Sequence, residues 1–267
     1  MGAAATPSIT SARNPRVQSA RKLRRRAWRA RSGECLAEGP AVIAEALRST
    51  HEITDLFVTS DAPPALAVQA SEAGAHVHEV GHTVLRSLSD TVTSQGAVAV
   101  VSVQTVSLAD LASSDLVVVL GEVRDPGNAG TLARSALAAG ASGAVFVAGT
   151  VDPFGPKTIR ASAGSIFHLP VVTSVALEEA LNELRGSGLQ VLGTEARADK
   201  SIYEADLRAP TAMIVGNEGW GLPQGARELV DEIVSIPMQG PVESINAGIA
   251  GSVMLFEAAR QRARVGR

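Results

Sequence analysis

Cysteine and long apolar runs are scarce in this chain of 267 residues. The single cysteine, Cys35, excludes an internal disulfide and has no partner for a metal site, so we expect a small buried side chain there. Although 45% of the residues are hydrophobic, no run approaches the ~18–20 apolar residues that a membrane span requires. No secretory signal pattern is recognisable either. These absences predict a cytoplasmic protein with no membrane partner and no metal.

Several common signatures of catalysis are also missing from the sequence. It contains no G-x-G-x-x-G, no G-x-x-x-x-G-K-[ST], no G-x-S-x-G and no H-E-x-x-H. Their absence argues against a dehydrogenase, a nucleoside triphosphatase or kinase, a serine hydrolase of the elbow type and a zinc protease. His76, His78 and His82 alternate along a predicted strand and its exit, a pattern that indicates structural or surface roles.

Acidic residues are missing from residues 13–31, which hold nine basic residues. Because the whole chain has 24 basic and 27 acidic residues, the remainder is strongly acidic. A cationic segment on an acidic body is the pattern expected for contact with nucleic-acid phosphates, the alternative being a solvated helix face. The predicted RNA-binding residues of this segment are Arg16, Arg21, Lys22, Arg24, Arg25, Arg26 and Arg29.

Helices and strands are expected to alternate through the first half of the chain. Residues 16–31 predict one helix with Val17, Leu23 and Trp28 as sparse apolar anchors. The pattern then predicts a strand and helix within 35–47, strands at 52–60, 76–80 and 97–103, and helices at 64–74 and 82–90. We predict a small α/β domain over residues 1–104, followed by a linker at 105–114.

The second half, residues 115–267, repeats the alternation more strongly. The apolar run LVVVLGEV (116–123) is typical of a central parallel strand covered on both faces. Further strands are predicted at 143–149, 169–172, 189–196, 211–219 and 232–238, with helices at 128–139, 156–163, 175–188 and 243–265. The predicted fold class is therefore α/β, with a parallel sheet in this half.

Three loops follow predicted strands, where α/β sheets place their ligands. They are GEVRDPGNAGTLARSA (121–136), VGNEGWGLP (215–223) and SIPMQGPVESIN (235–246). Together they resemble the three signature motifs of the SpoU (TrmH) class of SPOUT RNA 2′-O-ribose methyltransferases. Asn128, Gly130 and Arg134 match the first motif, the glycine-rich turn at 216–221 matches the second, and 236–238 with 244–246 match the third. Ile245 stands where the family usually has Leu.

The N-terminal half is similar to the RNA-binding extension of that family. The similarity begins at Ser11, passes the basic segment to Glu38 and Gly39, and returns at the junction 93–96. It implies a small domain of the kind found in ribosomal and kink-turn RNA-binding proteins. For the C-terminal half the resemblance implies a deep trefoil knot and a homodimer, whereas the general rule that chains do not thread their own loops would predict an open sheet.

The resemblance also implies S-adenosylmethionine as the cofactor and assigns roles to individual residues. The cofactor-binding residues would be Thr194, Glu195, Gly216, Asn217, Ile236, Met238, Ile245 and Asn246. The catalytic residues would be Arg134, Asn128, Glu218, Ser244 and Asn246, with Arg134 reaching in from the other subunit and Arg160 contacting RNA phosphate.

Simple chemistry qualifies some of these roles. A guanidinium is a poor general base, so we expect Arg134 to hold a phosphate and to stabilise a developing alkoxide. Asn128 and Ser244 are also candidate helix caps. Loop glycines such as Gly216, Gly219 and Gly221 would allow positive φ angles and close backbone approach to a ligand.

The predicted function is methyl transfer from S-adenosylmethionine to a ribose 2′-hydroxyl of RNA. Ribosomal RNA is the favoured substrate because the N-terminal extension resembles that of the ribosomal RNA enzymes. Transfer RNA as the substrate, or a catalytically silent RNA-binding protein of the same fold, are the alternatives. A small-molecule enzyme of ordinary doubly wound topology would have no use for the arginine-rich segment.

Overall fold

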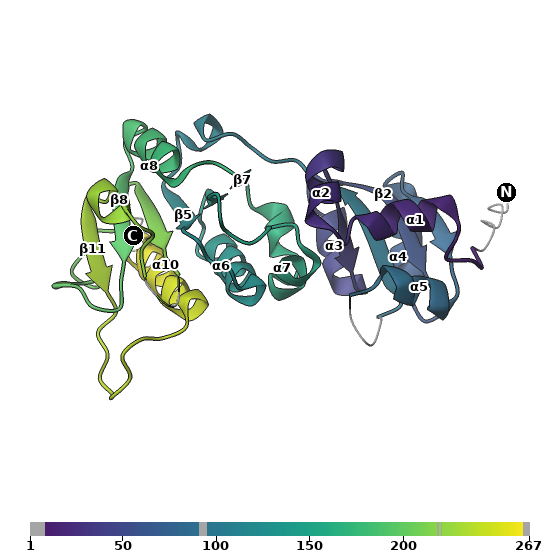
Figure 1. The fold of residues 1–267 in the computed structure, drawn as a ribbon. Coiled ribbons are helices and arrows are strands. Elements are labelled where there is room, and N and C mark those ends of the chain that lie inside the picture. Colours follow the sequence, from purple (N-terminus) through teal and green to yellow (C-terminus); the bar gives the residue numbers. More distant parts are fainter. Residues whose placement is uncertain (1–8, 91–94, 218, 220, 264–267) are drawn as a thin grey trace. The chain divides into compact units, whose positions relative to one another are not determined.

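A computed structural model describes residues 9–90, 95–217, 219 and 221–263. The chain forms two compact units, Met1–Gln104 with Phe154–His168, and Thr105–Pro153 with Leu169–Arg267 (Figure 1). Among the described residues, none of the helices has the length and apolar character needed to cross a membrane. Two sequence predictions, the junction residues 93–94 and Glu218, lie outside the described residues.

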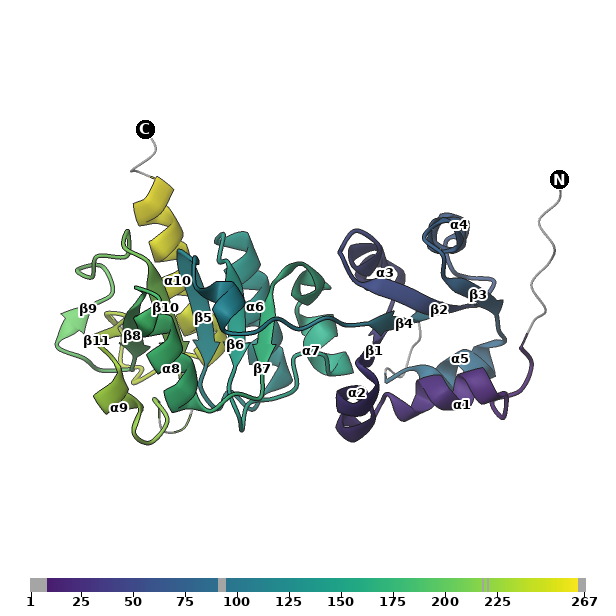
Figure 2. The ribbon, with the colours of Figure 1, turned by 90° about the horizontal axis from the view of Figure 1, so that it is seen from above.

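The first unit is built on a four-stranded mixed sheet of order β1-β4-β2-β3. Its strands are β1 (Glu34–Glu38), β2 (Glu52–Val58), β3 (His76–Glu79) and β4 (Ala97–Ser102). The strand β4 runs antiparallel to both β1 and β2, while β2 and β3 are parallel. Figure 2 shows α1 (Pro15–Lys22) and α5 (His82–Leu88) on one face, with α3 (Pro40–Leu47) and α4 (Pro64–Glu72) on the other. Cys35 lies in β1 and is buried, as predicted.

The prediction of one helix over residues 16–31 is wrong, because the chain forms two helices, α1 and α2 (Arg26–Ser32). Val17 and Leu23 are buried as predicted, but Trp28 is 36% exposed. Because the helix breaks between Leu23 and Arg26, the spacing from Val17 and Leu23 no longer sets the direction in which Trp28 points. Arg29 turns inward instead, and its Nη1 donates to the Leu23 carbonyl at 2.7 Å.

The segment Phe154–His168 comes from the second half of the sequence but packs within the first unit. It contains α7 (Pro156–Ala161) and a short 3-10 helix, η2 (Ser165–His168). His168 Nε2 lies 2.9 Å from Glu45 Oε2 in α3. The ring of His51 meets those of Phe154 and Phe167 edge to face, at centroid distances of 6.4 and 5.7 Å. Aromatic and polar contacts therefore both hold this segment.

The second unit contains a seven-stranded sheet of order β7-β6-β5-β10-β8-β11-β9 in which all neighbouring strands are parallel. The strands are β5 (Leu116–Leu120), β6 (Gly143–Phe146), β7 (Val171–Thr173), β8 (Gln190–Thr194), β9 (Lys200–Ser201), β10 (Thr211–Val215) and β11 (Glu232–Ser235). All five residues of β5 are buried between β6 and β10. The predicted α/β class and the central position of this strand are confirmed.

Helices cover both faces of the parallel sheet (Figure 2). On one face α6 (Pro126–Ala138) packs against α10 (Ala247–Ala263), and on the other lie α8 (Leu177–Gly186) and α9 (Ala226–Leu229). Neither α9, β9 nor the 3-10 helix η1 (Ala109–Leu111) was predicted. The knot stays a prediction from the resemblance.

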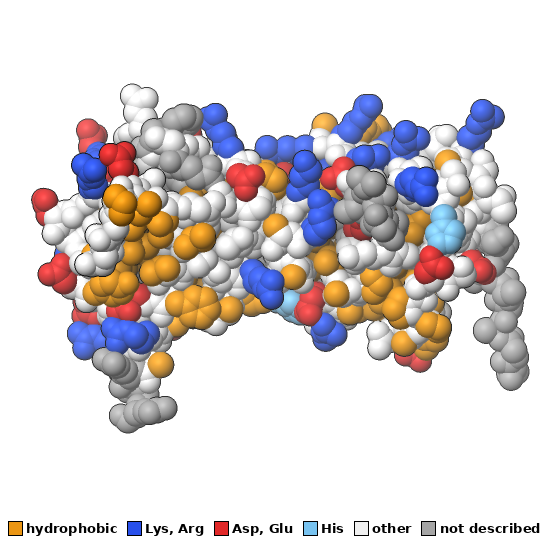
Figure 3. Space-filling view, turned by 90° about the horizontal axis from the view of Figure 1, so that it is seen from below, with side chains coloured by type: hydrophobic (Ala, Val, Ile, Leu, Met, Phe, Trp, Pro, Cys, Tyr) orange, Lys and Arg blue, Asp and Glu red, His pale blue; other side chains and the backbone are white. Residues whose placement is uncertain are grey.

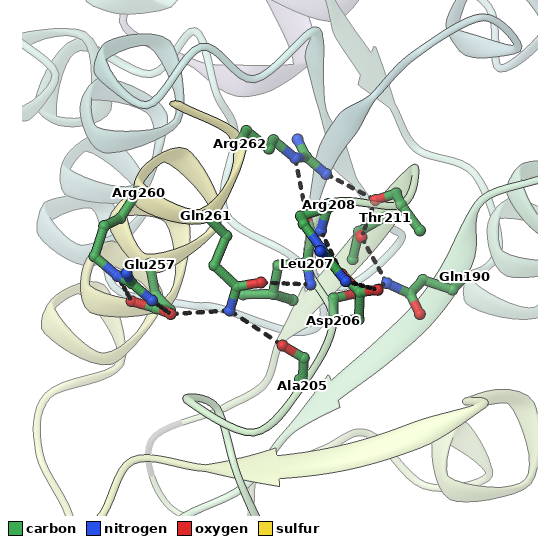
Figure 4. A network of polar contacts seen from close by, with 11 residues as sticks. Gln190, Ala205, Asp206, Leu207, Arg208, Thr211, Glu257, Arg260, Gln261 and Arg262 are labelled. Atoms are coloured by element: carbon green, nitrogen blue, oxygen red, sulfur yellow. Dashed lines mark hydrogen bonds and ion pairs between the residues drawn. The ribbon is translucent and has the colours of Figure 1, made fainter. Parts of the chain in front are cut away.

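The end of α10 is tied to the segment that precedes β10 by a network of polar side chains (Figure 4). Gln261 bonds to three groups at once: its Oε1 accepts from the Leu207 amide at 3.0 Å, and its Nε2 donates to the Ala205 carbonyl at 3.1 Å and to Glu257 at 2.9 Å. Arg262 Nε donates to the Leu207 carbonyl at 2.8 Å. These bonds fix the direction of α10, whose other end begins at the third motif loop.

Candidate active site

The three motif loops emerge from the same edge of the parallel sheet. The first follows β5, the second follows β10 and the third follows β11, and β10 lies between β5 and β8 in the sheet. Since parallel strands end at a common edge, loops that are far apart in the sequence are brought together there. The sheet order thus explains why the three motifs can form one site.

A cavity of about 650 Å³, here called the motif cavity, opens at this edge. Seven of the eight predicted cofactor-binding residues line it: Thr194, Glu195, Gly216, Asn217, Ile236, Met238 and Ile245. Other lining residues include Ser244 and Leu222, whereas Asn246 is not among them. The lining combines apolar side chains with charged groups and glycine backbone, a combination suited to a ligand that has both an aromatic ring and charged ends.

The second motif loop is a tight turn that only glycine permits at two positions. Asn217 and Gly221 exchange two backbone hydrogen bonds, at 2.7 and 2.9 Å. A Cβ on Gly216 would overlap the carbonyl of Gly221, and Gly221 itself has a φ of 73°. Gly219 has neither constraint, since its Cβ would come no closer than 3.4 Å to Asn217 Oδ1. The sequence predicted that the backbone of Gly216 approaches a ligand closely. In the structure its close neighbour is the backbone of Gly221, in the same loop.

The cap of α6 is Asp125, not the predicted Asn128. Asp125 Oδ1 accepts from the Asn128 amide at 2.8 Å, and Pro126 occupies the first helical position. An acidic residue directly before a proline is a recognised helix start, so this signal was present in the sequence. Asn128 is consequently the third residue of the helix, in its first turn, and it is buried.

Asn246 connects the third motif to the first. Its Nδ2 donates to Asn128 Oδ1 at 2.8 Å, and its Oδ1 accepts from the Ile249 amide at 3.1 Å, so it caps α10. The prediction that Ser244 caps this helix is wrong, because the helix begins three residues later at Ala247. Ser244 is exposed and lines the motif cavity instead.

A further bond joins the first and second loops. Asn217 Nδ2 donates to the Glu122 carbonyl at 3.1 Å, and Glu122 has a φ of 60°, which is uncommon for a residue other than glycine. Together with the pair Asn246 and Asn128, this contact ties all three motif loops to one another. The asparagines of the motifs thus have a structural role that the spacing alone did not reveal.

Arg134 lies at the surface of α6 and is not among the residues that line the motif cavity of its own chain. The structure therefore brings Asn128 and Asn246 together and places Ser244 at the cavity, but leaves Arg134 apart from them. The remaining predicted catalytic residue, Glu218, lies outside the described residues.

Two ion pairs at the rim of the motif cavity were not predicted. Glu195 pairs with Arg227, and Arg197 Nη2 lies 3.6 Å from Glu243 Oε1. Both arginines line the cavity. The partners are separated by tens of residues in sequence and carry no spacing signal, so sequence analysis could not have paired them.

The predicted RNA-binding side chains are exposed on α1, α2 and the turn between them, with one exception. Arg21, Lys22, Arg25 and Arg26 are exposed. Arg16 and Arg24 are also exposed, and each pairs with an aspartate, Asp55 at 2.9 Å and Asp90 at 3.3 Å respectively. The exception is Arg29, which is buried and fixed to Leu23, so we withdraw it from the predicted RNA contacts.

Arg160, the RNA-binding residue predicted in the second half, lies on α7. It is exposed, and its Nη1 is 4.0 Å from Glu38 Oε2. Of the three predicted histidines, His78 is buried and its Nε2 lies 2.7 Å from Asp55 Oδ1, whereas His76 and His82 are exposed. Among the described residues no group of three or more His, Cys, Asp or Glu side chains is arranged to hold a metal.

Both halves of the chain are similar to known protein families. The profile of the SpoU rRNA Methylase family matches residues 115–256, and that of the MRM3-like substrate binding domain matches residues 14–99. An uncharacterised tRNA/rRNA methyltransferase of Synechocystis is 35% identical over 96% of this chain and 94% of its own length. The 23S rRNA (guanosine(2553)-2′-O)-methyltransferase RlmP of Bacillus subtilis is 32% identical over 93% of this chain and 97% of its own.

Solved structures agree with the sequence comparisons. The crystal structure of an AdoMet-bound rRNA methyltransferase from Sinorhizobium meliloti superimposes with a TM-score of 0.85, at 32% identity, over 96% of this chain and 98% of that one. The SpoU methyltransferase AviRb of Streptomyces viridochromogenes, also in complex with AdoMet, gives a TM-score of 0.84 at 30% identity over 94% of this chain and 100% of that chain. On the motifs, the sheet order and these similarities, the chain belongs to the SpoU rRNA methylase family.

Proposed function

We propose that this chain transfers the methyl group of S-adenosylmethionine to a ribose 2′-hydroxyl of RNA, with ribosomal RNA as the substrate. The observation that carries the proposal is the meeting of the three motif loops at the motif cavity, in a chain of the SpoU rRNA methylase family. Relatives of known activity, such as RlmP, methylate a guanosine 2′-oxygen of 23S rRNA. A cytoplasmic location belongs to the same proposal.

The motif cavity has the features needed to hold S-adenosylmethionine. Ile236, Met238 and Ile245 offer apolar contact to the adenine, while Glu195 and Thr194 offer polar contacts to the charged and hydroxyl-bearing parts. The turn at Gly216 exposes backbone at the cavity wall. When bound, the cofactor supplies a methyl group on a positively charged sulfur.

The chain's own residues then have two tasks, alignment of the acceptor ribose and stabilisation of the charge that develops as its hydroxyl loses a proton. Arg134 suits the second task, because a guanidinium keeps its positive charge and can also hold the neighbouring phosphate. Asn128 and Asn246 act as positioning residues, since their mutual bond holds α6 and the start of α10 in register. The roles of Glu218 and Ser244 stay predictions.

A homodimer is part of the proposal. Ile249 and Phe256 lie on α10 seven residues apart, hence on one face, and are 54% and 51% exposed. Such an apolar face is suited to contact with a second copy of the chain. A dimer would also explain why Arg134 stands apart from the cavity of its own chain, since a partner could supply it.

The test is methyl transfer from labelled S-adenosylmethionine to unmodified ribosomal RNA and, separately, to transfer RNA. Wild type should label ribosomal RNA at a ribose 2′-oxygen, and Arg134→Ala should lose nearly all transfer while it still binds the cofactor. Arg86→Ala, which changes an exposed arginine of α5, is the matched control and should be unaffected. Label on transfer RNA alone would show that the substrate is transfer RNA and not ribosomal RNA. If the protein bound the cofactor but transferred methyl groups to neither RNA, the result would favour a catalytically silent RNA-binding protein.

A further inference from the structure

An exposed tryptophan stands in the basic helical segment. Trp28 lies on α2 and is 36% exposed, although tryptophan is among the side chains that gain most from burial. Within the described part of the first unit, only Val68 is another large hydrophobic side chain with comparable exposure. The fold therefore presents the indole ring to solvent at the position where the charge is most concentrated.

Cations surround this ring. Lys22 Nζ lies 4.8 Å and Arg31 Cζ 5.9 Å from the ring centroid. Further exposed arginines lie on α1, on α2 and in the turn between them: Arg21, Arg24, Arg25 and Arg26. Figure 3 shows Lys and Arg side chains (blue) gathered where α1 and α2 form the surface of the first unit. An aromatic ring among phosphate-binding groups is the combination found in single-stranded nucleic-acid sites.

The position of the ring is fixed by the fold. Arg29 is buried and bonded to the Leu23 carbonyl, which joins α2 to the end of α1. The helix α2 ends at Ser32, and the φ of 69° at its C-cap, Gly33, lets the chain turn into β1. Because its supporting helix is anchored through Arg29 and capped at Gly33, Trp28 needs little ordering when a ligand binds, and this favours affinity.

We propose that Trp28 is a stacking platform for an unpaired base of the RNA substrate, with Lys22 and Arg31 contacting the adjacent phosphates. The inference rests on the proposed function, because it takes RNA as the substrate. In a duplex the bases are already stacked on one another, so an indole ring can stack only on a base in a single strand, loop or bulge. An exposed cation–π contact is weaker than base stacking, so Lys22 can move from the ring to a phosphate on its flexible stem.

Binding to two RNAs by the full-length protein tests the platform. The probes are a single-stranded RNA of about 12 nucleotides and the same strand annealed to its complement. Trp28→Ala should weaken binding of the single strand by roughly ten-fold and leave duplex binding unchanged. Trp28→Phe should retain most of the affinity, since it keeps an aromatic face. Val68→Ala on α4 is the matched control for loss of an exposed apolar side chain and should change neither affinity.

The salt dependence separates stacking from phosphate contact. Lys22→Ala should reduce the salt slope by roughly one for both RNAs, whereas Trp28→Ala should leave the slope intact. Because the chain has two tryptophans, a Trp220→Phe background isolates Trp28 fluorescence, which stacking on a base of the single strand should quench. Three results would each overturn the platform. Trp28→Ala could lose affinity equally for both RNAs, it could keep its full affinity for the single strand, or the Trp28 fluorescence could stay unquenched when the single strand binds. If the wild-type protein bound neither RNA, the proposed function would fail together with the platform. If the wild-type protein bound and methylated RNA while Trp28→Ala behaved in the same way, only the platform would fail.

Discussion

Single residues set the shape of the motif cavity, and Gly216 shows how. Its backbone lies against Gly221 with no room for a Cβ, and the two bonds between Asn217 and Gly221 close the turn behind it. Gly219, in the same loop, has room for a Cβ. Two glycines of one motif are therefore expected to differ in their tolerance of substitution.

Gly216→Ala should open this turn and weaken S-adenosylmethionine binding by at least ten-fold. Forcing a methyl group into a packed site costs about 1–3 kcal/mol, and here the backbone itself must move. Isothermal titration calorimetry measures the affinity, and urea denaturation measures the stability. Gly219→Ala should bind almost as wild type does, and equal losses in the two variants would refute the steric explanation.

His51 is expected to make the first unit sensitive to acid. Burial, and then the charge of His168, lower the pKa of His51 below its ordinary value of 6.5. Its Nδ1 accepts from the Gln104 amide at 3.2 Å, a bond that only the unprotonated nitrogen can make. The folded protein therefore binds this proton more weakly than the unfolded chain does, so stability must fall as the pH drops below about 6.5 and level off below the folded pKa.

The measurement is the melting temperature between about pH 8 and pH 5, around the ordinary histidine pKa. Part of the decrease on the acid side should disappear in His51→Gln, which cannot take up the proton. His76→Gln, at an exposed position of β3, serves as the control and should follow the wild-type curve. Parallel curves for wild type and His51→Gln would show that His51 does not titrate in this range.

At the scale of elements, α10 is the helix on which the site depends. It begins at the asparagine that bonds to α6, and its last turns are tied to the segment before β10 by Gln261 and Arg262. Burial lowers the pKa of Arg262, although the side chain retains carbonyl partners at Leu207 and Ala209. Because α10 is bonded at both ends, these bonds fix the place where the third motif loop joins the helix.

Gln261→Ala should destabilise the protein by about 1–3 kcal/mol, because the amide of the buried Leu207 would lose its acceptor. Urea denaturation followed by circular dichroism gives the free energy of unfolding. Arg208→Ala removes a local pair with Asp206 at the surface of the same segment and should have no measurable effect. Similar losses in both variants would mean that the whole segment, and not this bond, anchors the helix.

For the whole molecule, the proposed dimer makes a prediction about shared sites. Phe256→Asp should place a charge on the exposed apolar face of α10 and shift the protein to a monomer in analytical ultracentrifugation. Tyr203→Asp, at another exposed aromatic residue, should not change the oligomeric state. Mixing Arg134→Ala with Gly216→Ala chains should restore part of the methyl transfer, since one mixed site would have both residues intact. A mixture that stays inactive would count against a site shared between subunits.

Local patterns in the sequence are enough to predict the parallel α/β half, the succession of its main strands along the chain and the three motifs, because apolar periodicity and glycine-rich loops are local properties. It also located the basic segment. The packing of the elements in three dimensions, by contrast, determines that Arg29 is buried while Trp28 is exposed, and that residues 154–168 pack with the first unit.

The link from Asn246 to Asn128 and the rim pair of Glu195 with Arg227 were likewise decided only in three dimensions. Some of these features are contacts between residues that are far apart in the sequence. The others are directions of side chains, which depend on where a helix breaks. Such contacts follow from the packing of whole elements, and no local pattern in the chain records them.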